Sequence, residues 1–191
     1  MADGRGGGLR VTDPRVMRAL AHPARIEIVE YLNDTGAAVT ATEAAEMVGL
    51  SPSATSYHLR ELAKYGLVEQ APSRGDGRER IWRGTGNGVR IDPDLDQPEA
   101  LAASRELVAL YLGRDLARMQ EWWAQAELEP AEWRDASTIL GQRLLITVDE
   151  LRELNQQVHA LLERYKLRER KDDAPEGARQ VRVNYAAFPD D

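Results

Sequence analysis

The sequence of 191 residues has no cysteine and only three histidines. Without cysteine, the chain can form no disulfide, no thiolate metal site and no cysteine nucleophile, which fits a cytoplasmic protein. No apolar run approaches the roughly 20 residues that a membrane-spanning helix needs, so we expect no membrane association. The glycine-rich start, residues 1–8, lacks the apolar stretch of a signal peptide.

Motifs of catalysis are missing as well. The sequence has no G-x-S-x-G elbow, no phosphate-binding glycine loop and no pair of carboxylates in a setting that would perturb their pKa. His159 and Glu163 stand four residues apart, a spacing that suits half a metal site on a helix but is more often a charged pair on a solvated face. We therefore predict that the chain is not an enzyme and uses no metal or other cofactor.

The net charge of −7 hides an uneven distribution along the chain. Residues 1–91 hold 12 basic and 11 acidic residues, which leaves 13 basic and 21 acidic residues for the remainder. Residues 51–90 alone carry 7 basic against 4 acidic residues. Any attraction for nucleic acid must therefore come from this short basic stretch and not from the chain as a whole.

The N-terminal half is predicted to be a series of short helices followed by a hairpin. Residues 1–12 are expected to be a disordered lead. Capping and breaking residues then mark the helix starts at Asp13, Pro23, Thr42 and Ser51. Two strands, at residues 67–70 and 80–83, are joined by a turn at Pro72–Gly77. Three helices, the third preceded by a tight glycine turn, and then a two-stranded hairpin are the order of a winged helix-turn-helix.

The C-terminal half begins after a Gly-, Pro- and Asp-rich linker at residues 84–96 with a long helix, Pro98 to Leu128. Its apolar residues cover more than one narrow stripe, so we expect burial on two sides, against its own domain and against a partner. A capping box at Thr147 and Glu150 predicts another helix. Strands are predicted at Ile139–Ile146 and Val181–Tyr185, with a loop at residues 166–177.

Three motifs of the first half resemble the ArsR-like bacterial transcriptional regulators. VMRALAHPARIEIVEYL (residues 16–32) resembles their opening signature, and LSPSATSYHLRELAKYGLVEQ (50–70) resembles their recognition helix and first wing strand. GRERIWR (77–83) resembles the second wing strand of one branch. The resemblance covers about residues 12–90. RLLITVDEL (143–151) and ARQVRVNYAAFP (178–189) are similar, less specifically, to the C-terminal extension of that branch.

The resemblance implies a regulator that represses and that releases DNA when it binds an effector. The chain departs from the metal-sensing members of the family because it has no cysteine. Thiolate sensing of arsenic or cadmium is therefore out of reach.

The helix that starts at Ser51 has the surface of a recognition helix. Thr55, Leu59 and Leu62 fall on one face of this helix at helical spacing and are expected to face the core. The candidate DNA contacts on the other side of the helix are Ser53, Ser56, Tyr57, Arg60 and Lys64. Hydroxyls near a helix N-terminus suit phosphates and base edges, and Arg60 suits either a guanine or a phosphate. The alternative is an ordinary solvated helix face.

Basic residues also mark the predicted wing, at Arg74, Arg78 and Arg80. Arginines of a wing commonly contact phosphates or enter the minor groove, whereas the alternative role is solubility of the hairpin. For one of Arg80 and Arg83, the alternative role is support of the strand. His58 stands between the two faces of the helix, and both a DNA contact and a structural hydrogen bond stay open for it. His22 is interpreted as a packing residue at a helix junction.

Aromatic residues of the second half form the last candidate site. Tyr111, Trp122, Trp123 and Trp133 are expected to belong to the dimer core, and an effector pocket is the alternative.

The predicted fold is α+β and mainly α. A winged helix-turn-helix domain spans residues 13–90, and residues 98–188 hold a long dimerisation helix with a small α/β extension. The predicted function is sequence-specific DNA binding by a homodimeric repressor, with double-stranded operator DNA and a small-molecule effector as partners, in the cytoplasm at the nucleoid. The alternative is a winged helix that serves as a protein–protein interaction module without binding DNA.

Overall fold

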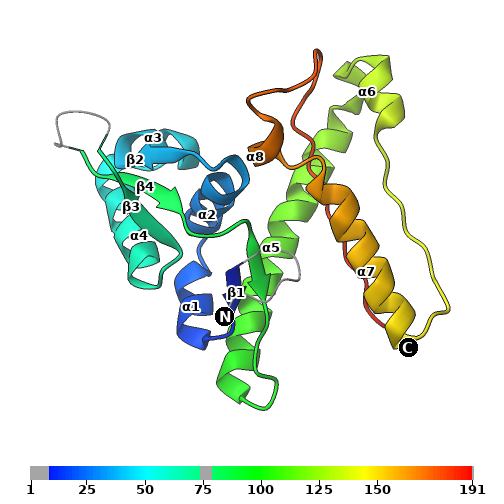
Figure 1. Cartoon of the computed structure of the whole chain (residues 1–191), viewed down its shortest axis with the longest axis horizontal. Helices are drawn as coiled ribbons and strands as arrows, with labels where there is room; N and C mark the ends of the chain where they lie inside the picture. Colours follow the sequence, from blue (N-terminus) through cyan, green and yellow to red (C-terminus); the bar gives the residue numbers. More distant parts are fainter. Residues whose placement is uncertain (1–8, 74–78, 191) are drawn as a thin grey trace. The chain divides into compact units, whose positions relative to one another are not determined.

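The computed structural model describes residues 9–73 and 79–190 (Figure 1). The N-terminal elements are β1 (Leu9–Val11), α1 (Pro14–Leu20), α2 (Pro23–Thr35), β2 (Ala38–Thr40), α3 (Ala41–Val48), α4 (Pro52–Lys64), β3 (Val68–Ala71), β4 (Ile81–Gly84) and β5 (Val89–Ile91). The remaining elements are α5 (Pro98–Ala124), the 3₁₀ helix η1 (Ala126–Leu128), α6 (Ala131–Ala136), α7 (Val148–Glu163) and α8 (Leu167–Arg170). The mainly helical α+β class is thus confirmed.

The chain folds as two compact units. Unit 1 runs up to Tyr111 and also includes Lys166–Glu176, so α8 belongs to it. Unit 2 consists of Leu112–Tyr165 and the residues from Gly177 onward.

Caps fix the helix boundaries of unit 1, at the predicted residues for α1, α2 and α4 and slightly before the predicted Thr42 for α3. The side chain of Asp13 accepts a hydrogen bond from the backbone N of Arg15 at 2.8 Å, and Ser51 caps α4. Thr40 and Glu43 form a reciprocal capping box, so α3 begins at Ala41. At the other end of α2, Gly36 has a φ of 63°, a left-handed conformation that glycine adopts without steric cost.

The core of unit 1 lies where α2 and α4 pack against a three-stranded antiparallel sheet of order β2-β4-β3. α5 adds Leu107, which is fully buried. The largest fully buried side chains of unit 1 are Met17, Leu20, Ile26, Ile28, Leu32, Leu59, Leu62, Leu67 and Leu107. Burial of such side chains contributes about 1.5–3 kcal/mol each relative to exposure, so this core holds α4 in place.

A second, two-stranded sheet differs from the sequence prediction. Leu9–Val11, predicted to be part of a disordered lead, forms β1, and Val89–Ile91, predicted to be linker, forms β5. The strands pair in parallel, with Val11 opposite Ile91, and Val11 is only 2% exposed. Each strand is three residues long, and its partner lies about 80 residues away in the sequence. A local pattern therefore carries no sign of this pairing.

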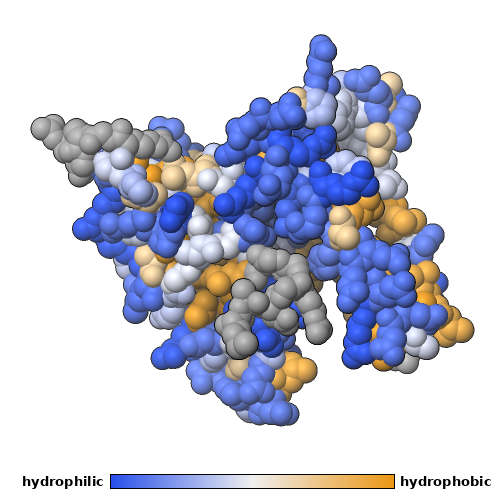
Figure 2. All heavy atoms as spheres, in the orientation of Figure 1, coloured by the Kyte–Doolittle hydropathy of each residue, from blue (hydrophilic) through white to orange (hydrophobic). Residues whose placement is uncertain are grey.

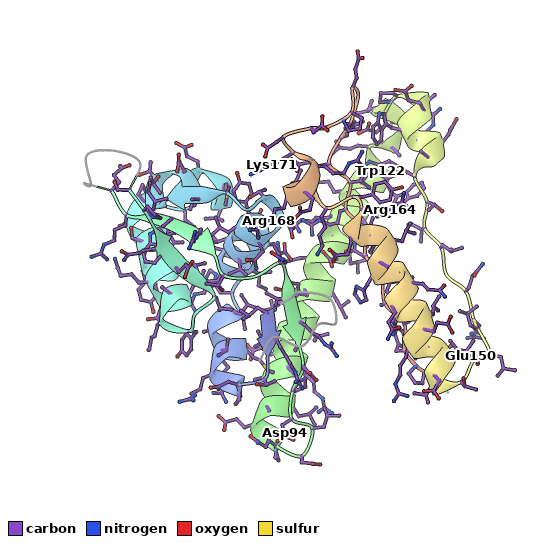
Figure 3. All side chains as sticks on the ribbon, viewed as in Figure 1. Asp94, Trp122, Glu150, Arg164, Arg168 and Lys171 are labelled. Atoms are coloured by element: carbon purple, nitrogen blue, oxygen red, sulfur yellow. The ribbon has the colours of Figure 1, made fainter. Side chains whose placement is uncertain are left out.

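α8 packs on the C-terminal end of α2 within unit 1, where a loop was predicted (Figure 3). A guanidinium N–H of Arg168 donates to Oδ1 of Asn87 at 2.6 Å. Nζ of Lys171 donates to the carbonyl oxygen of Thr35 at 3.0 Å. A short C-terminal segment thus reaches the helix that supports the N-terminal core.

Unit 2 contains the second half of α5, η1, α6 and α7, and Ala126 is its one buried residue among those described. The capping box of Thr147 and Glu150 is present at the start of α7, as predicted. The two predicted strands, at Ile139–Ile146 and Val181–Tyr185, do not form. Neither segment has a strand beside it to complete a ladder, and their apolar side chains are exposed. Figure 2 shows apolar residues on the surface of this part of the chain.

Candidate nucleic-acid interface

α4 is anchored on one side and exposed on the other. Its buried residues include Thr55, Leu59 and Leu62, as the sequence predicts, and each is 0% exposed. Ser51 caps its first turn through a bond from the backbone N of Ala54 at 3.3 Å. One face of the helix is therefore packed in the core, and the opposite face is exposed to solvent.

Hydroxyl and basic side chains make up that outer surface. Ser53, Arg60 and Lys64 are exposed, Ser56 is half-buried, and Tyr57 is 51% exposed. Donors of this kind at one helix surface match both phosphate oxygens and base edges.

An open hollow of about 390 Å³ lies beside this surface, between α4, the start of α3 and strand β4. Its lining residues are Thr40, Ala41, Thr42, Ser56, Arg60, Glu79, Arg80 and Trp82. Two of the predicted contacts, Arg60 of the helix and Arg80 at the wing, thus share one concave surface. Two guanidinium groups against one carboxylate, that of Glu79, favour an anionic occupant.

The two described arginines of the wing have different surroundings. Arg83 lies opposite Glu69 in the β3–β4 register, and the two side chains form an ion pair at 2.6 Å. This cross-strand pair supports the hairpin. Arg80 is exposed and lines the hollow instead. Arg74 and Arg78, the other predicted wing contacts, lie outside the described residues.

His58, on α4, is buried, with 9% of its surface exposed. Its Nδ1 accepts a hydrogen bond from Nε of Arg25 at 3.1 Å, and its ring centroid lies 4.5 Å from that of His22. Burial, together with the nearby charges of His22 and Arg25, lowers the pKa of His58. Of the two roles left open by the sequence, this geometry matches the structural hydrogen bond.

The family comparison matches residues 20–71 to a model described as a helix-turn-helix domain. The match spans α2, β2, α3, α4 and β3, and the next strand in the sequence is the hairpin partner β4. The chain therefore carries a winged helix-turn-helix domain, whose motifs resemble those of the ArsR-like regulators. Such domains are the DNA-binding modules of transcriptional regulators. No curated protein matches the chain.

Several solved structures resemble the chain in part. The winged helix-turn-helix domain of Mb0332 from Mycobacterium bovis, described as homodimeric, is 22% identical, over 53% of this chain and 76% of that one, with a TM-score of 0.33. HlyU from Vibrio cholerae is 23% identical, over 51% and 85%, with a TM-score of 0.32. The adhesin competence repressor AdcR from Streptococcus pyogenes is 14% identical, over 76% and 82%, with a TM-score of 0.34. At these scores the likenesses add nothing to the assignment, which rests on the family match and the observed elements.

Three of the four predicted aromatic residues make ring contacts within unit 2. Trp122 and Trp123 contact each other edge to face at 5.0 Å between ring centroids (Trp122 is labelled in Figure 3). Trp133 stacks instead beneath the guanidinium of Arg179, 4.9 Å from its ring centroid, and Arg179 also pairs with Glu129 at 2.7 Å. Tyr111 is the last residue of the N-terminal stretch of unit 1.

Within residues 9–73 and 79–190, no helix is long and apolar enough to cross a membrane. In the same ranges, no three His, Asp or Glu side chains gather as they would around a metal ion. His159, considered above with Glu163, is exposed on α7.

Two groups near the winged helix-turn-helix surface were not predicted from the sequence. The start of α3 lines the hollow through Thr40 and Thr42, and the Thr40–Glu43 capping box was a readable sign of that helix start. Arg25 reaches α4 from α2 across 33 residues of sequence, and nothing local indicates that contact.

Proposed function

We propose that this chain is a homodimeric repressor that binds an operator through α4 and the wing. The observation that carries the proposal is the shared concave surface of Arg60 and Arg80 beside the exposed hydroxyls of α4. A DNA strand has a phosphate for each nucleotide, and two guanidinium groups in one hollow suit such an anion.

Under this proposal, the contacts divide by position. Ser53, Ser56 and Tyr57, near the start of α4, face the base edges of the major groove. Arg60 and Arg80 hold the phosphate backbone between the major groove and the wing. Lys64 completes the backbone contacts of α4, and Arg74 and Arg78 stay predicted contacts of the wing.

The dimer is supported by an apolar stripe on α5. Val108, Leu112, Leu116 and Trp123 are exposed by 39%, 60%, 52% and 47%. At 100° per residue they fall within about 80° of arc, on one side of the helix. A continuous exposed apolar stripe of this kind marks a protein contact surface. A second copy of the chain covers this stripe, and the resulting dimer presents two recognition helices to two half-sites.

The exposed apolar side chains of unit 2 support the same proposal. Leu140, Leu144 and Leu145 are exposed by 75%, 57% and 103%. A unit with one buried residue among those described gains little stability alone, so residues 98–188 are proposed to complete their core in the dimer. Trp122 and Trp123 are proposed to join that core. The repressor role follows the ArsR-like resemblance and places the protein in the cytoplasm with DNA.

The test is selection of bound duplexes from a random-sequence library by the full chain, followed by footprinting. We expect a two-fold symmetric site with half-sites about one helical turn apart. A reporter gene placed behind the selected site should then be silenced when the chain is expressed. If no sequence is enriched, the winged domain is a protein-interaction module and the proposal is wrong; if the reporter is activated, the repressor role is wrong.

A further inference from the structure

Arg25 connects three parts of the winged domain. It lies half-buried in the first turn of α2. Its guanidinium donates to the carbonyl oxygen of Ala19 at 2.6 Å and to Nδ1 of His58 at 3.1 Å. The same group lies 5.9 Å from the ring centroid of Tyr57. One side chain thus joins the end of α1 to two consecutive residues of α4.

The contact with Ala19 has a clear backbone reason. In a continuous helix, the carbonyl of residue 19 would accept from the N–H of residue 23, but residue 23 is a proline and has none. Arg25 supplies the missing donor. The guanidinium is therefore held by the backbone, and its distance to α4 is fixed.

The contact with His58 defines the state of that imidazole. An arginine N–H can only donate, so Nδ1 of His58 must be unprotonated and Nε2 carries the hydrogen. The extra proton of an imidazolium would have to go to Nδ1, the atom that already accepts from Arg25. Protonation of His58 thus breaks this hydrogen bond and places a cation beside the guanidinium.

The contact with Tyr57 reaches the DNA surface. Its ring packs over the guanidinium on one side and edge to face against His58, at 5.7 Å between centroids. Half of Tyr57 remains exposed at the surface proposed to face the bases. The orientation of the Tyr57 side chain is therefore set by Arg25, a half-buried residue of α2.

We propose that Arg25 is a positioning residue for operator recognition, which fixes the side chain of Tyr57 on α4 and keeps His58 in its neutral, hydrogen-bonded form. The inference rests on the proposed function, because it concerns how the DNA-facing surface is held. It assigns specificity to a residue beneath the recognition helix.

The proposal includes a pH dependence of specific binding. The charged and titratable groups that act on His58 are His22 from the α1–α2 junction, Arg25 from α2 and its neighbour Tyr57 on α4. Two of these are cationic or become so in acid. Acidification therefore disrupts the Arg25–His58 contact and releases Tyr57.

The test compares two duplexes, the one selected by the wild-type chain and a random-sequence duplex of equal length, by fluorescence anisotropy. Arg25→Lys keeps the charge but has no planar fork to bridge Ala19 and His58. It should weaken binding to the selected duplex by roughly three- to tenfold, the range for freeing one ordered side chain. Binding to random DNA should change less than about twofold. Arg15→Lys, the same replacement at an exposed arginine paired with Asp13, is the matched control and should change neither.

A pH series separates positioning from mere stability. Between about pH 7.5 and 5.5, the wild-type ratio of selected to random affinity should fall, whereas in His58→Gln, which cannot titrate, it should stay flat. The Arg25→Lys and Tyr57→Leu effects should be less than additive. If Arg25→Lys lowers the melting temperature too far, Arg25→Gln at lower temperature replaces it.

The outcomes are distinct. A folded Arg25→Lys variant that keeps the wild-type affinity ratio and pH profile overturns the role of Arg25 alone. A wild-type chain that selects no duplex overturns the proposed function, and this assignment with it.

Discussion

Nζ of Lys171 donates a hydrogen bond to the carbonyl oxygen of Thr35, the last residue of α2. The final carbonyls of a helix lack intrahelical donors and form the negative end of its dipole, so a lysine there is doubly favourable. Beside it, Arg168 bonds Asn87 and covers Gly36 (Figure 3). A segment distant in sequence thereby completes the end of the helix that carries Arg25.

Removing both side chains should loosen the end of α2. Arg168→Ala with Lys171→Ala deletes two exposed polar contacts, worth about 1 kcal/mol together. We expect hydrogen–deuterium exchange of the last-turn amides of α2 to accelerate by about fivefold. Arg152→Ala, which removes an exposed ion pair with Asp149 in unit 2, is the control and should leave those amides unchanged. Unaltered exchange in the double variant would show that α8 does not stabilise α2.

Substitution of two glycines distinguishes the cost of backbone strain from the cost of a steric clash with Arg168. Gly36 and Gly49 both end helices in the left-handed region, with φ of 63° and 65°. Alanine at either position should lower the free energy of unfolding by about 1–2 kcal/mol through the backbone alone. A Cβ at Gly49 meets nothing within 4 Å, whereas one at Gly36 lies 3.0 Å from Nε of Arg168. Gly36→Ala should therefore cost more in urea denaturation, and the excess should vanish in the Arg168→Ala background.

Acid should destabilise the winged domain before its carboxylates titrate. Burial lowers the pKa of both His22 and His58, so the folded state takes up these protons less readily than the unfolded chain. The free energy of unfolding is then highest above the ordinary histidine pKa, near 6.5, and falls as pH decreases through it. Urea midpoints between about pH 7.5 and 5.5 should show this decline. His22→Asn, which keeps a helix cap, combined with His58→Gln should flatten it; an unchanged slope would contradict the prediction.

The sequence predicts the fold best where local chemistry decides it. Proline at the start and glycine at the end of a helix, as at Pro52 and Gly36, depend on backbone geometry that a single sequence displays. The buried face of α4 follows from spacing alone. The short pairing of β1 with β5 is not predictable from a local sequence pattern, because its free energy comes from residues far apart in the chain. In unit 2, alternating apolar residues such as Val181 and Val183 predicted a strand, yet a strand also needs a neighbour to accept its hydrogen bonds.

On the functional surface, too, local patterns predict some residues, whereas long-range packing decides others. Ser53, Arg60 and Lys64 are exposed on α4 because helical periodicity puts them opposite the core. His58 falls between the two faces, and only the position of Arg25 on another helix shows which partner it takes. Long-range contacts of this kind are set by the packing of α2 against α4, which no local pattern specifies.

The hollow between α4 and the wing should account for part of the salt dependence of DNA binding. Each phosphate contact contributes about one unit to the slope of log affinity against log salt, and each substitution acts twice in a dimer. Arg60→Ala and Arg80→Ala should each lower the slope by about two, on selected and random duplexes alike. Arg83→Ala is the matched control, since Arg83 is paired with Glu69 across the hairpin. If the slope of Arg80→Ala stays at the wild-type value, the wing strand does not contact the DNA backbone.

Charge on the apolar stripe of α5 should separate the proposed dimer. Leu112 and Leu116 lie one helical turn apart on the stripe, and both are more than half exposed. Leu112→Asp with Leu116→Asp would bury two unpaired carboxylates at the contact between copies, which costs several kcal/mol in each subunit. Light scattering should give 21.3 kDa for this variant and twice that mass for the wild type. Ala117→Asp, an exposed position on the opposite side of α5, adds one such charge away from the stripe and should leave the dimer intact.

Because a monomer has one recognition helix, the double variant should also lose the tight binding to a two-half-site duplex while it keeps the weaker binding to one half-site. A double variant that remains dimeric would place the contact between copies elsewhere than on this stripe.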